Sequence, residues 1–214
     1  MGIAVKICGI SEAEHAHTAA NAGADFLGFV FFPPSPRNLS LDAARALAPE
    51  LPTEPKRVGV FVSADEALIT GAITALNLDL IQLHGKETPE DAARLKKLTG
   101  LPIIKAIAVS EEADLAKADL FAPHVDYILF DAKPPKGALL PGGNAVSFPW
   151  HILAGKTLPF KWLLAGGLTP ENAAEAIAAS GTAGLDISSG IETAPGKKSS
   201  TLIKAFLTAV KAVK

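Results

Sequence analysis

Cysteine occurs once in the 214 residues, as Cys8 in the segment KICGI, where an apolar run ends and a glycine follows. A thiol that only fills space would more naturally lie in the middle of a strand, whereas a thiol at the end of a strand can meet a substrate. Free cysteine is also among the most commonly buried residues and packs as a small hydrophobic side chain. A functional role and a packing role therefore both stay open for Cys8 taken alone.

Further polar side chains stand where apolar runs end or in the loops that follow. They are Arg37, Gln82, His84, Asp131 and Asp186. Arg37 lies in the stiff segment PPSPR, and its planar guanidinium suits a carboxylate, which it can bind through two parallel hydrogen bonds. His84 is equally suited to a substrate contact and to a structural hydrogen bond. Asp186 could instead accept hydrogen bonds from loop amides.

Two glycine-containing segments, LLAGGLTP and GLDISSG, have the composition of a phosphate site. They contain Gly166, Gly167, Ser188, Ser189 and Gly190. Backbone N–H groups in glycine turns after strands, together with the start of a short helix, bind phosphate in barrel proteins. The first segment alone could be only a tight turn, but the second favours an anion site. The segment PGKKSS lacks the first glycine of a P-loop, and no GxGxxG opens a helix, so nucleotide cofactors gain no support.

Several classes of partner are disfavoured by the composition. Twenty basic against twenty-two acidic residues leave a formal charge of -2, which argues against nucleic acid. No metal site is predicted, because the remaining histidines are two apart on a predicted helix (His15, His17) or isolated (His124, His151). We expect surface or capping roles for them. The chain has no long apolar stretch and no signal-peptide pattern, so we expect a cytoplasmic protein without membrane contact.

Eight short apolar runs must position these polar side chains. They start at Ile3, Asp25, Arg57, Leu78, Leu101, Val125, Lys161 and Ala183. Near-continuous apolarity is typical of parallel strands that are covered on both faces.

Helix signals lie between the runs, so we expect a helix after each strand. Capping signals stand at Ser11 with Glu14, Ser63 with Glu66, Thr88 with Pro89, and Thr169 with Pro170. At the end of the chain, an apolar stripe at helical spacing comprises Leu202, Phe206, Val210 and Val213.

Eight strand–helix units predict one α/β domain over residues 1–214, a (β/α)8 TIM barrel, because parallel strands need crossovers and a closed barrel leaves no edge. A doubly wound sheet is the alternative, although it rarely needs eight regular units. The second and sixth runs are followed by long segments, FPPSPRNLS and DAKPPKGALLPGGNAVS. Both lie on the face where barrels build active sites, and the strand ends would bring the polar side chains together there.

The segments KICGI, GADFLGFVF with SPR, VGVFV, QLHG, LFD, LAGGL and GLDISSGIE, in this order, resemble the phosphoribosylanthranilate isomerase family of tryptophan biosynthesis. The match runs from Lys6 to Glu192. The resemblance implies a barrel without a cofactor. It also implies an Amadori rearrangement of N-(5-phosphoribosyl)anthranilate to 1-(2-carboxyphenylamino)-1-deoxy-D-ribulose 5-phosphate. The only partner implied is this phosphorylated small molecule, and both a monomer and a homodimer stay open.

The resemblance also implies a role for each motif residue. Cys8 would be the general base and Asp131 the general acid, which must be protonated to donate to the furanose ring oxygen. Arg37 would bind the anthranilate carboxylate, and the two glycine turns would bind the phosphate. Independently of the resemblance, we expect Gln82, His84 and Asp186 to contact the substrate, because they stand where apolar runs end. Lys6 would point inward with Cys8, about 7 Å away along the strand, and we expect its charge to favour the thiolate. Pairing of Lys6 with an acid purely for packing is the alternative.

Two other functions remain alternatives. Another sugar-phosphate barrel, such as an indole-glycerol-phosphate synthase-like enzyme or a triose-phosphate-type isomerase, would need a lysine cluster or a glutamate at the strand ends. A barrel that only binds a phosphorylated metabolite would not need both Cys8 and Asp131. Departures from the family pattern lie in the sixth loop: Ala132-Lys133-Pro134-Pro135, Gly142-Gly143-Asn144-Ala145 and Phe148-Pro149-Trp150. We expect Ala145 and Pro149 to alter the conformational freedom of this loop.

Overall fold

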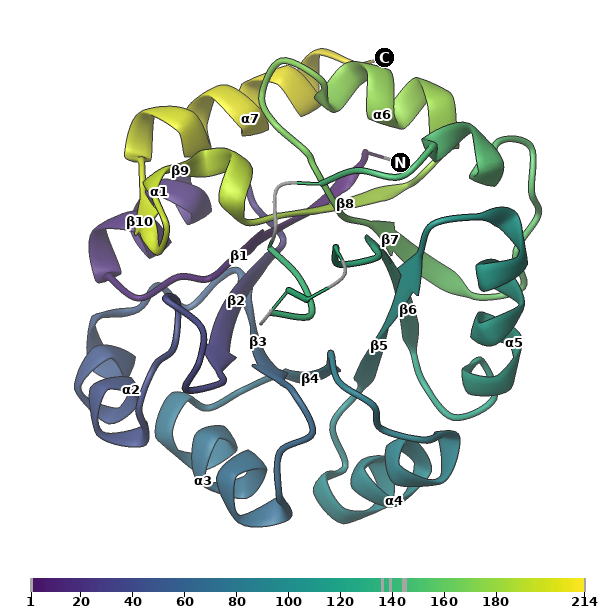
Figure 1. Ribbon diagram of the computed structural model, residues 1–214. Helices are drawn as coiled ribbons and strands as arrows, with labels where there is room; N and C mark the ends of the chain where they lie inside the picture. Colours follow the sequence, from purple (N-terminus) through teal and green to yellow (C-terminus); the bar gives the residue numbers. More distant parts are fainter. Residues whose placement is uncertain (1, 136, 139, 144–145, 214) are drawn as a thin grey trace.

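A computed structural model describes residues 2–135, 137–138, 140–143 and 146–213 of the chain, and in it eight parallel strands close into a barrel (Figure 1). The strands are β1 (Ala4–Cys8), β2 (Phe26–Phe31), β3 (Lys56–Phe61), β4 (Leu80–Leu83), β5 (Ile103–Val109), β6 (Tyr127–Ala132), β7 (Lys161–Leu164) and β8 (Gly184–Ile187). All eight predicted runs are therefore strands, and the predicted TIM barrel is confirmed.

In the described part of the chain, seven α-helices surround the barrel (Figure 1). They are α1 (Ala13–Asn21), α2 (Leu41–Leu47), α3 (Glu66–Leu76), α4 (Pro89–Thr99), α5 (Lys117–Phe121), α6 (Ala173–Ser180) and α7 (Ser200–Ala212). Short 3-10 helices add η1 (Ala48–Glu50), η2 (Glu112–Ala116), η3 (Trp150–Leu153) and η4 (Ser189–Ile191).

The expectation of a helix after every strand is wrong for β6. In the described part of the segment between β6 and β7, the helical turn is η3, which packs against α6 in place of an α-helix. The run KPPKGALLPGG explains this difference, because proline removes backbone donors and glycine disfavours helical geometry. Pro149 accepts the amide of Ile152 at 3.1 Å and so begins η3.

Two of the four predicted capping signals are displaced along the chain. Helix α1 follows Glu12, which makes no side-chain cap, so Ser11 is not the cap. Helix α3 is capped by Asp65, whose carboxylate accepts the amide of Leu68, and Ser63 instead adopts a positive φ of 47° in the turn after β3. The two serines fail for different reasons: the Asp65 carboxylate provides the cap at α3, whereas α1 begins after Glu12 without any side-chain cap.

The other two signals also differ from each other. Thr88 caps α4 as predicted, in a reciprocal capping box with Asp91. Thr169 does not cap α6, which begins only after Asn172. The Asn172 side chain turns back to accept the amide of Thr169 at 2.8 Å, so the segment between β7 and α6 is a tight turn.

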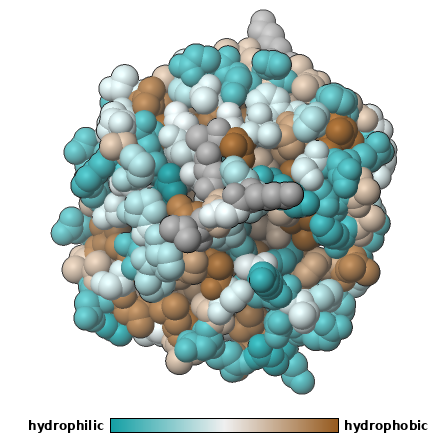
Figure 2. Space-filling view, in the orientation of Figure 1, coloured by the Kyte–Doolittle hydropathy of each residue, from teal (hydrophilic) through white to brown (hydrophobic). Residues whose placement is uncertain are grey.

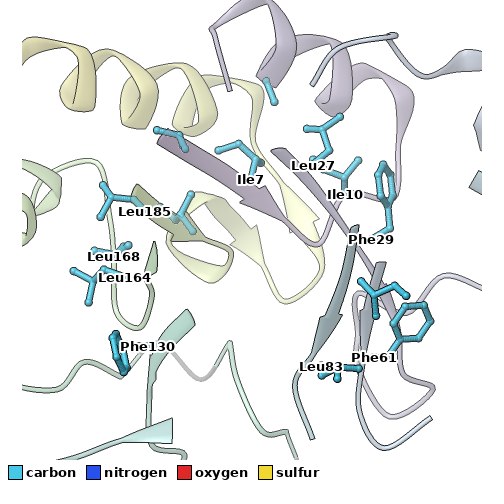
Figure 3. Packing of buried hydrophobic residues seen from close by; sticks show 14 of the residues in the cluster. Ile7, Ile10, Leu27, Phe29, Phe61, Leu83, Phe130, Leu164, Leu168 and Leu185 are labelled. Carbon is cyan, nitrogen blue, oxygen red and sulfur yellow. The ribbon is translucent and has the colours of Figure 1, made fainter. Parts of the chain in front are cut away.

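Side chains alternate between the barrel interior and the layer under the helices. Lys6 and Cys8 of β1 point inward, whereas Ile7 between them packs under the helices. Figure 3 shows part of this outer layer, in which Ile7, Leu27 and Phe29 belong to the hydrophobic cluster between strands and helices. The interior is filled at one end by a second cluster: Phe26, Val58, Leu80, Ile104, Ala106, Leu129, Leu163 and Ala165. The polar groups at the carboxyl ends of the strands lie above this plug.

Helix α7 closes the ring of helices by packing against α1 (Figure 1). Two residues of the predicted stripe, Phe206 and Val210, are buried on it, together with Ile203 and Leu207. A two-stranded hairpin, β9 (Glu192–Ala194) and β10 (Lys197–Lys198), precedes α7 and was not expected from the sequence. The described helices include none that is both long and apolar enough to cross a membrane.

Candidate active site

One pocket at the carboxyl ends of the strands collects most of the residues singled out in the sequence. It is lined by Cys8, Arg37, Gln82, His84, Asp131, Gly166, Gly167, Asp186, Ser188 and Ser189, among others. Figure 2 shows this end of the molecule, with hydrophilic residues around much of its outer rim. Gly190 does not line the pocket among the described residues. The barrel therefore brings together side chains from β1, β4, β6 and β8 and from the loops after β2 and β7.

The thiol and an ammonium lie side by side at the end of β1. Cys8 is buried, and Lys6 is fully buried two residues earlier. A Cβ atom added at Gly28 would lie 2.8 Å from Lys6 Nζ and 2.9 Å from Cys8 Sγ, so both groups pack against this glycine of β2. Lys6 Nζ also donates a hydrogen bond to Asp186 Oδ1 at 3.0 Å. The predicted inward direction of Lys6 is therefore confirmed, and its acidic partner is Asp186.

Burial and mutual attraction compete in setting the pKa values of Cys8, Lys6 and Asp186. Burial raises the pKa of the Cys8 thiol, although Lys6 and, more weakly, Lys198 favour the thiolate. Burial alone would lower the pKa of Lys6, but attraction to Asp186 and then to Cys8 outweighs it, and the pKa of Lys6 is raised. Burial likewise raises the pKa of Asp186 against the attraction of Lys6. The thiol form of Cys8 is therefore favoured, and Lys6 is the main group that opposes this preference.

Asp131 is held by the strand that carries it and by His84, which directly follows β4. Its Oδ1 accepts the backbone amide of Ala132 at 2.8 Å, and its Oδ2 lies 3.2 Å from His84 Nε2. Gln82 Nε2 lies 2.9 Å from His84 Nδ1. A donating Gln82 amide leaves the imidazole proton on Nε2, where it faces the carboxylate of Asp131. The three side chains thus form a chain of hydrogen bonds that ends at the predicted acid.

Loop six lies directly against this pair. A Cβ atom added at Gly142 would lie 2.7 Å from both Asp131 Oδ2 and His84 Nε2. An added Cβ at Gly143 would lie 2.7 Å from Arg37 Nη1, and Gly143 has a positive φ of 71°. Glycine is therefore needed at both positions for the loop to approach the polar side chains. Asn144 and Ala145, which the sequence also singled out, lie outside the described residues.

One edge of the Arg37 guanidinium is paired with Glu192, a residue that the sequence did not single out. Its Nε and Nη2 donate to the two carboxylate oxygens of Glu192, each at 2.8 Å. Lys198 Nζ donates to the same carboxylate at 2.7 Å. Burial opposes the ionisation of Glu192, but hydrogen bonds from Arg37 and Lys198 outweigh it and lower its pKa. Burial lowers the pKa of Lys198.

A sequence signal for these two residues did exist. Glu192 ends the segment GLDISSGIE, and Lys198 stands in PGKKSS, the segment that resembles part of a P-loop. The pairing itself could not be predicted, because Arg37 and Glu192 are 155 residues apart in the chain.

The two glycine turns lie next to each other at one side of the pocket. Gly166 and Gly167 both have positive φ values, 89° and 67°, which glycine adopts without strain. An added Cβ at Gly190 would overlap the carbonyl oxygen of Leu168, so glycine is needed there for the turn after β8 to pack on the turn after β7. Ser188 donates to the carbonyl of Cys8 at 3.1 Å. The turns thus present backbone amides and serine hydroxyls near β1.

Two further expectations need correction. Among the described residues, Asp186 accepts its hydrogen bond from Lys6 and not from a loop amide. This follows from the register, in which Lys6 of β1 pairs directly with Asp186 of β8. His15 is not a surface residue but is 9% exposed, because it faces inward from α1, whereas His17 points outward and its Nε2 lies 2.9 Å from the carbonyl of Glu50.

Known proteins are similar to this chain in both sequence and fold. The family model described as N-(5'phosphoribosyl)anthranilate (PRA) isomerase matches residues 5–209. N-(5'-phosphoribosyl)anthranilate isomerase of Paramagnetospirillum magneticum is 50% identical over 211 residues, which cover 99% of this chain and 98% of the relative. The relative of the same name from Rhodopseudomonas palustris is 47% identical over 212 residues, with 99% and 97% covered.

Solved structures agree with these matches. The crystal structure of phosphoribosyl anthranilate isomerase from Thermotoga maritima superposes with a TM-score of 0.87 at 37% identity and 98% coverage of both chains. Another, of the isomerase in complex with reduced 1-(o-carboxyphenylamino)-1-deoxyribulose 5-phosphate, gives 0.84 at 35% identity, again with 98% coverage of both chains. With a family match over nearly its whole length, and relatives that agree in sequence and in fold, this chain belongs to the N-(5'-phosphoribosyl)anthranilate isomerase family.

Proposed function

We propose that this protein is an enzyme that isomerises N-(5-phosphoribosyl)anthranilate to 1-(2-carboxyphenylamino)-1-deoxy-D-ribulose 5-phosphate, with Cys8 as general base and Asp131 as general acid. The observation that carries the proposal is the joint position of these two residues. They come from β1 and β6, strands that do not pair, yet both line one pocket together with Arg37 and the two glycine turns. The whole chain would serve as one barrel domain for this reaction.

Asp131 would start the reaction. In its protonated form it donates a proton to the furanose ring oxygen, the C1–O bond breaks, and the nitrogen lone pair forms the C1=N bond of a protonated imine with an open sugar chain. The carboxylate left behind is an acceptor for the Nε2 proton of His84, which lies 3.2 Å away. His84 and Gln82 therefore support the charge that develops on Asp131 during the first step.

Cys8 completes the reaction as a thiolate. It removes the proton from C2 of the imine, and the resulting enol tautomerises to the ketone of the product. Because burial raises the pKa of Cys8, the thiolate needs a cation in contact. Lys6 supplies that cation, since its ammonium packs against the same glycine as the sulfur. Lys6 then has a chemical role in addition to its pairing with Asp186.

The remaining pocket residues would bind the two anionic ends of the substrate. The guanidinium edge of Arg37 that is not paired with Glu192 carries Nη1 and binds the anthranilate carboxylate. The backbone amides of Gly166, Gly167, Ser188 and Ser189 and the Ser189 hydroxyl bind the phosphate, because the Ser188 hydroxyl already donates to the Cys8 carbonyl. Gly190 contributes by holding the two turns together, and Asp186 contacts the sugar hydroxyls from β8.

A fluorescence assay of substrate consumption tests the catalytic assignments. Cys8→Ala and Asp131→Asn should each lower kcat by about two or more orders of magnitude, the scale of general acid or base loss. Thermal unfolding should show that both variants still fold. An Asp131→Asn protein with undiminished turnover would eliminate the proposed acid, and a fully active Cys8→Ala protein would eliminate the base.

A further inference from the structure

The hairpin of β9 and β10 packs directly on the loop that carries Arg37. Its turn residue Gly196 has a positive φ of 78°, and a Cβ atom added there would lie 2.5 Å from the carbonyl oxygen of Pro36. Pro36 immediately precedes Arg37 in the chain. Only glycine allows the hairpin to approach this closely while keeping its backbone conformation. The hairpin and the loop after β2 therefore form one packed unit at the mouth of the barrel.

Glu192 uses its whole carboxylate within this unit. Oε1 accepts from Arg37 Nε and Lys198 Nζ, and Oε2 accepts from Arg37 Nη2 and the amide of Gly196. The Glu192 side chain is only 4% exposed, so these hydrogen bonds replace water around it. A buried carboxylate with four donors is fixed in position. Its two-point contact fixes the plane of the guanidinium in turn.

Lys198 connects Glu192 to Ser188, which lines the pocket. Its side chain is completely buried, and Nζ donates to the Glu192 carboxylate, to the Ser188 carbonyl at 2.9 Å and to the Ser188 hydroxyl at 3.3 Å. Three acceptors match the three protons of an ammonium group. Since Ser188 in turn donates to the Cys8 carbonyl, Lys198 links the hairpin to the end of β1.

The charges of this cluster do not cancel. Two cations, Arg37 and Lys198, face the single carboxylate of Glu192, so one positive charge is left at the edge of the pocket. Arg37 lines the pocket, and its Nη1 lies beside Gly143 of loop six. A buried excess of one positive charge suits a ligand that brings one negative charge.

We propose that Glu192 and Lys198 are positioning residues that hold Arg37 in its ligand-binding orientation and so set the preference for a substrate with a ring carboxylate. The inference rests on the proposed function, in which Arg37 binds the anthranilate carboxylate. Fixing a long arginine side chain before binding removes an entropic cost that the ligand would otherwise have to overcome. Without Glu192 and Lys198, the Arg37 guanidinium would still be present but could rotate away from the ligand carboxylate.

Calorimetric titration with two stable ligands tests this inference. The first is reduced 1-(o-carboxyphenylamino)-1-deoxyribulose 5-phosphate, and the second is the same compound with hydrogen in place of the carboxyl group. The ratio of their two Kd values measures the carboxylate preference separately from binding of the sugar phosphate. For the unaltered protein we expect a ratio of about 10 to 100, the scale of a charged hydrogen-bond pair.

The variants separate orientation from general stability. Arg37→Met should abolish the preference, and Glu192→Gln and Lys198→Met should each lower it by about tenfold, since a freed guanidinium loses most of its advantage. Glu192→Asp keeps the charge but shortens the side chain, so it should also lower the preference if Glu192→Gln folds poorly. Lys198→Arg should retain part of it. The Kd for the ligand without the carboxyl group should stay within about twofold in the Glu192 variants. For Lys198→Met, which also removes the hydrogen bonds to Ser188, the ratio of the two Kd values is the readout.

Lys197→Met is the matched control, because Lys197 is the exposed neighbour of Lys198 in the same hairpin. It should leave both Kd values unchanged. If Arg37→Met kept the preference, the assignment of Arg37 in the proposed function would fail. If Arg37→Met lost the preference but Glu192→Gln, Glu192→Asp and Lys198→Met kept it, or weakened both ligands equally, the positioning role would be overturned while the proposed function stood.

Discussion

At the scale of single residues, Cys8 and Asp186 share one cation, Lys6, which opposes the effect of burial on the thiol. Lys6 attracts both anions, and Asp186 repels the thiolate. The sulfur therefore lies in a field with opposing contributions, on top of the burial that raises its pKa. Because Lys6 interacts with both Cys8 and Asp186, any further charged group in the pocket changes how strongly the thiolate is stabilised.

Replacing Lys6 should shift the titration of the thiol in a direction that follows from these charges. Lys6→Met removes the main group that lowers the pKa of Cys8, so the rate of alkylation by iodoacetamide should rise only at higher pH than in the unaltered protein. Turnover should fall by about tenfold or more, the lower range of effects on proton transfer. Asp186→Asn removes a repulsion and should shift the alkylation profile to lower pH.

Lys56→Met, an exposed change on β3, is the control for the loss of a lysine from a strand. It should leave both the alkylation profile and turnover unaltered. If Lys6→Met behaved like this control, the ammonium would have only a packing role beside Asp186.

At the scale of elements, loop six depends on a glycine where the pocket leaves no room for a side chain. Gly142→Ala would place a methyl group 2.7 Å from Asp131 Oδ2 and His84 Nε2, so the loop or the pair of side chains must shift. We expect kcat to fall by about tenfold or more, since small displacements of catalytic groups carry large rate penalties. The thermal midpoint should change little, because the loop lies outside the barrel core.

Gly137→Ala provides the comparison within the same loop. Gly137 has a positive φ of 82°, but an added Cβ would meet no described atom within 4 Å. This variant carries backbone strain without the contact at Asp131. A loss of kcat as large as that of Gly142→Ala would show that general strain in the loop, and not the contact, is responsible.

Elements differed in how well the sequence predicted them. The strands were found because their apolar runs are local and nearly continuous, and Thr88 was found because its cap lies within four residues. Ser63 was misassigned because a carboxylate from another loop, Glu87, accepts its amide at 2.7 Å across the barrel rim. The two hydrogen bonds between Arg37 and Glu192 could not be predicted for the same reason. Contacts between residues far apart in the chain leave no local pattern.

At the scale of the whole molecule, the site exists only when the barrel closes. Lys6 meets Asp186 because β1 pairs with β8, and Ser188 reaches the Cys8 carbonyl across the same seam. Helix α7 covers this seam from outside by packing against α1 (Figure 1). The first and last elements of the chain thus jointly build the thiol end of the pocket, and their association should be part of one cooperative folding unit.

Replacing Phe206, a fully buried aromatic residue of α7, tests whether helix and barrel unfold cooperatively. Phe206 is fully buried, and Phe206→Ala should lower the free energy of unfolding by about 3 to 5 kcal/mol through lost burial and a cavity. Calorimetry should show a single transition moved to lower temperature, because helix and barrel unfold together. Leu120→Ala is the control, since Leu120 is 64% exposed on α5, and it should change stability by less than about 0.5 kcal/mol. A separate early transition in Phe206→Ala, with Cys8 becoming reactive before the remaining barrel unfolds, would show that the seam opens independently and that the chain is not one cooperative domain.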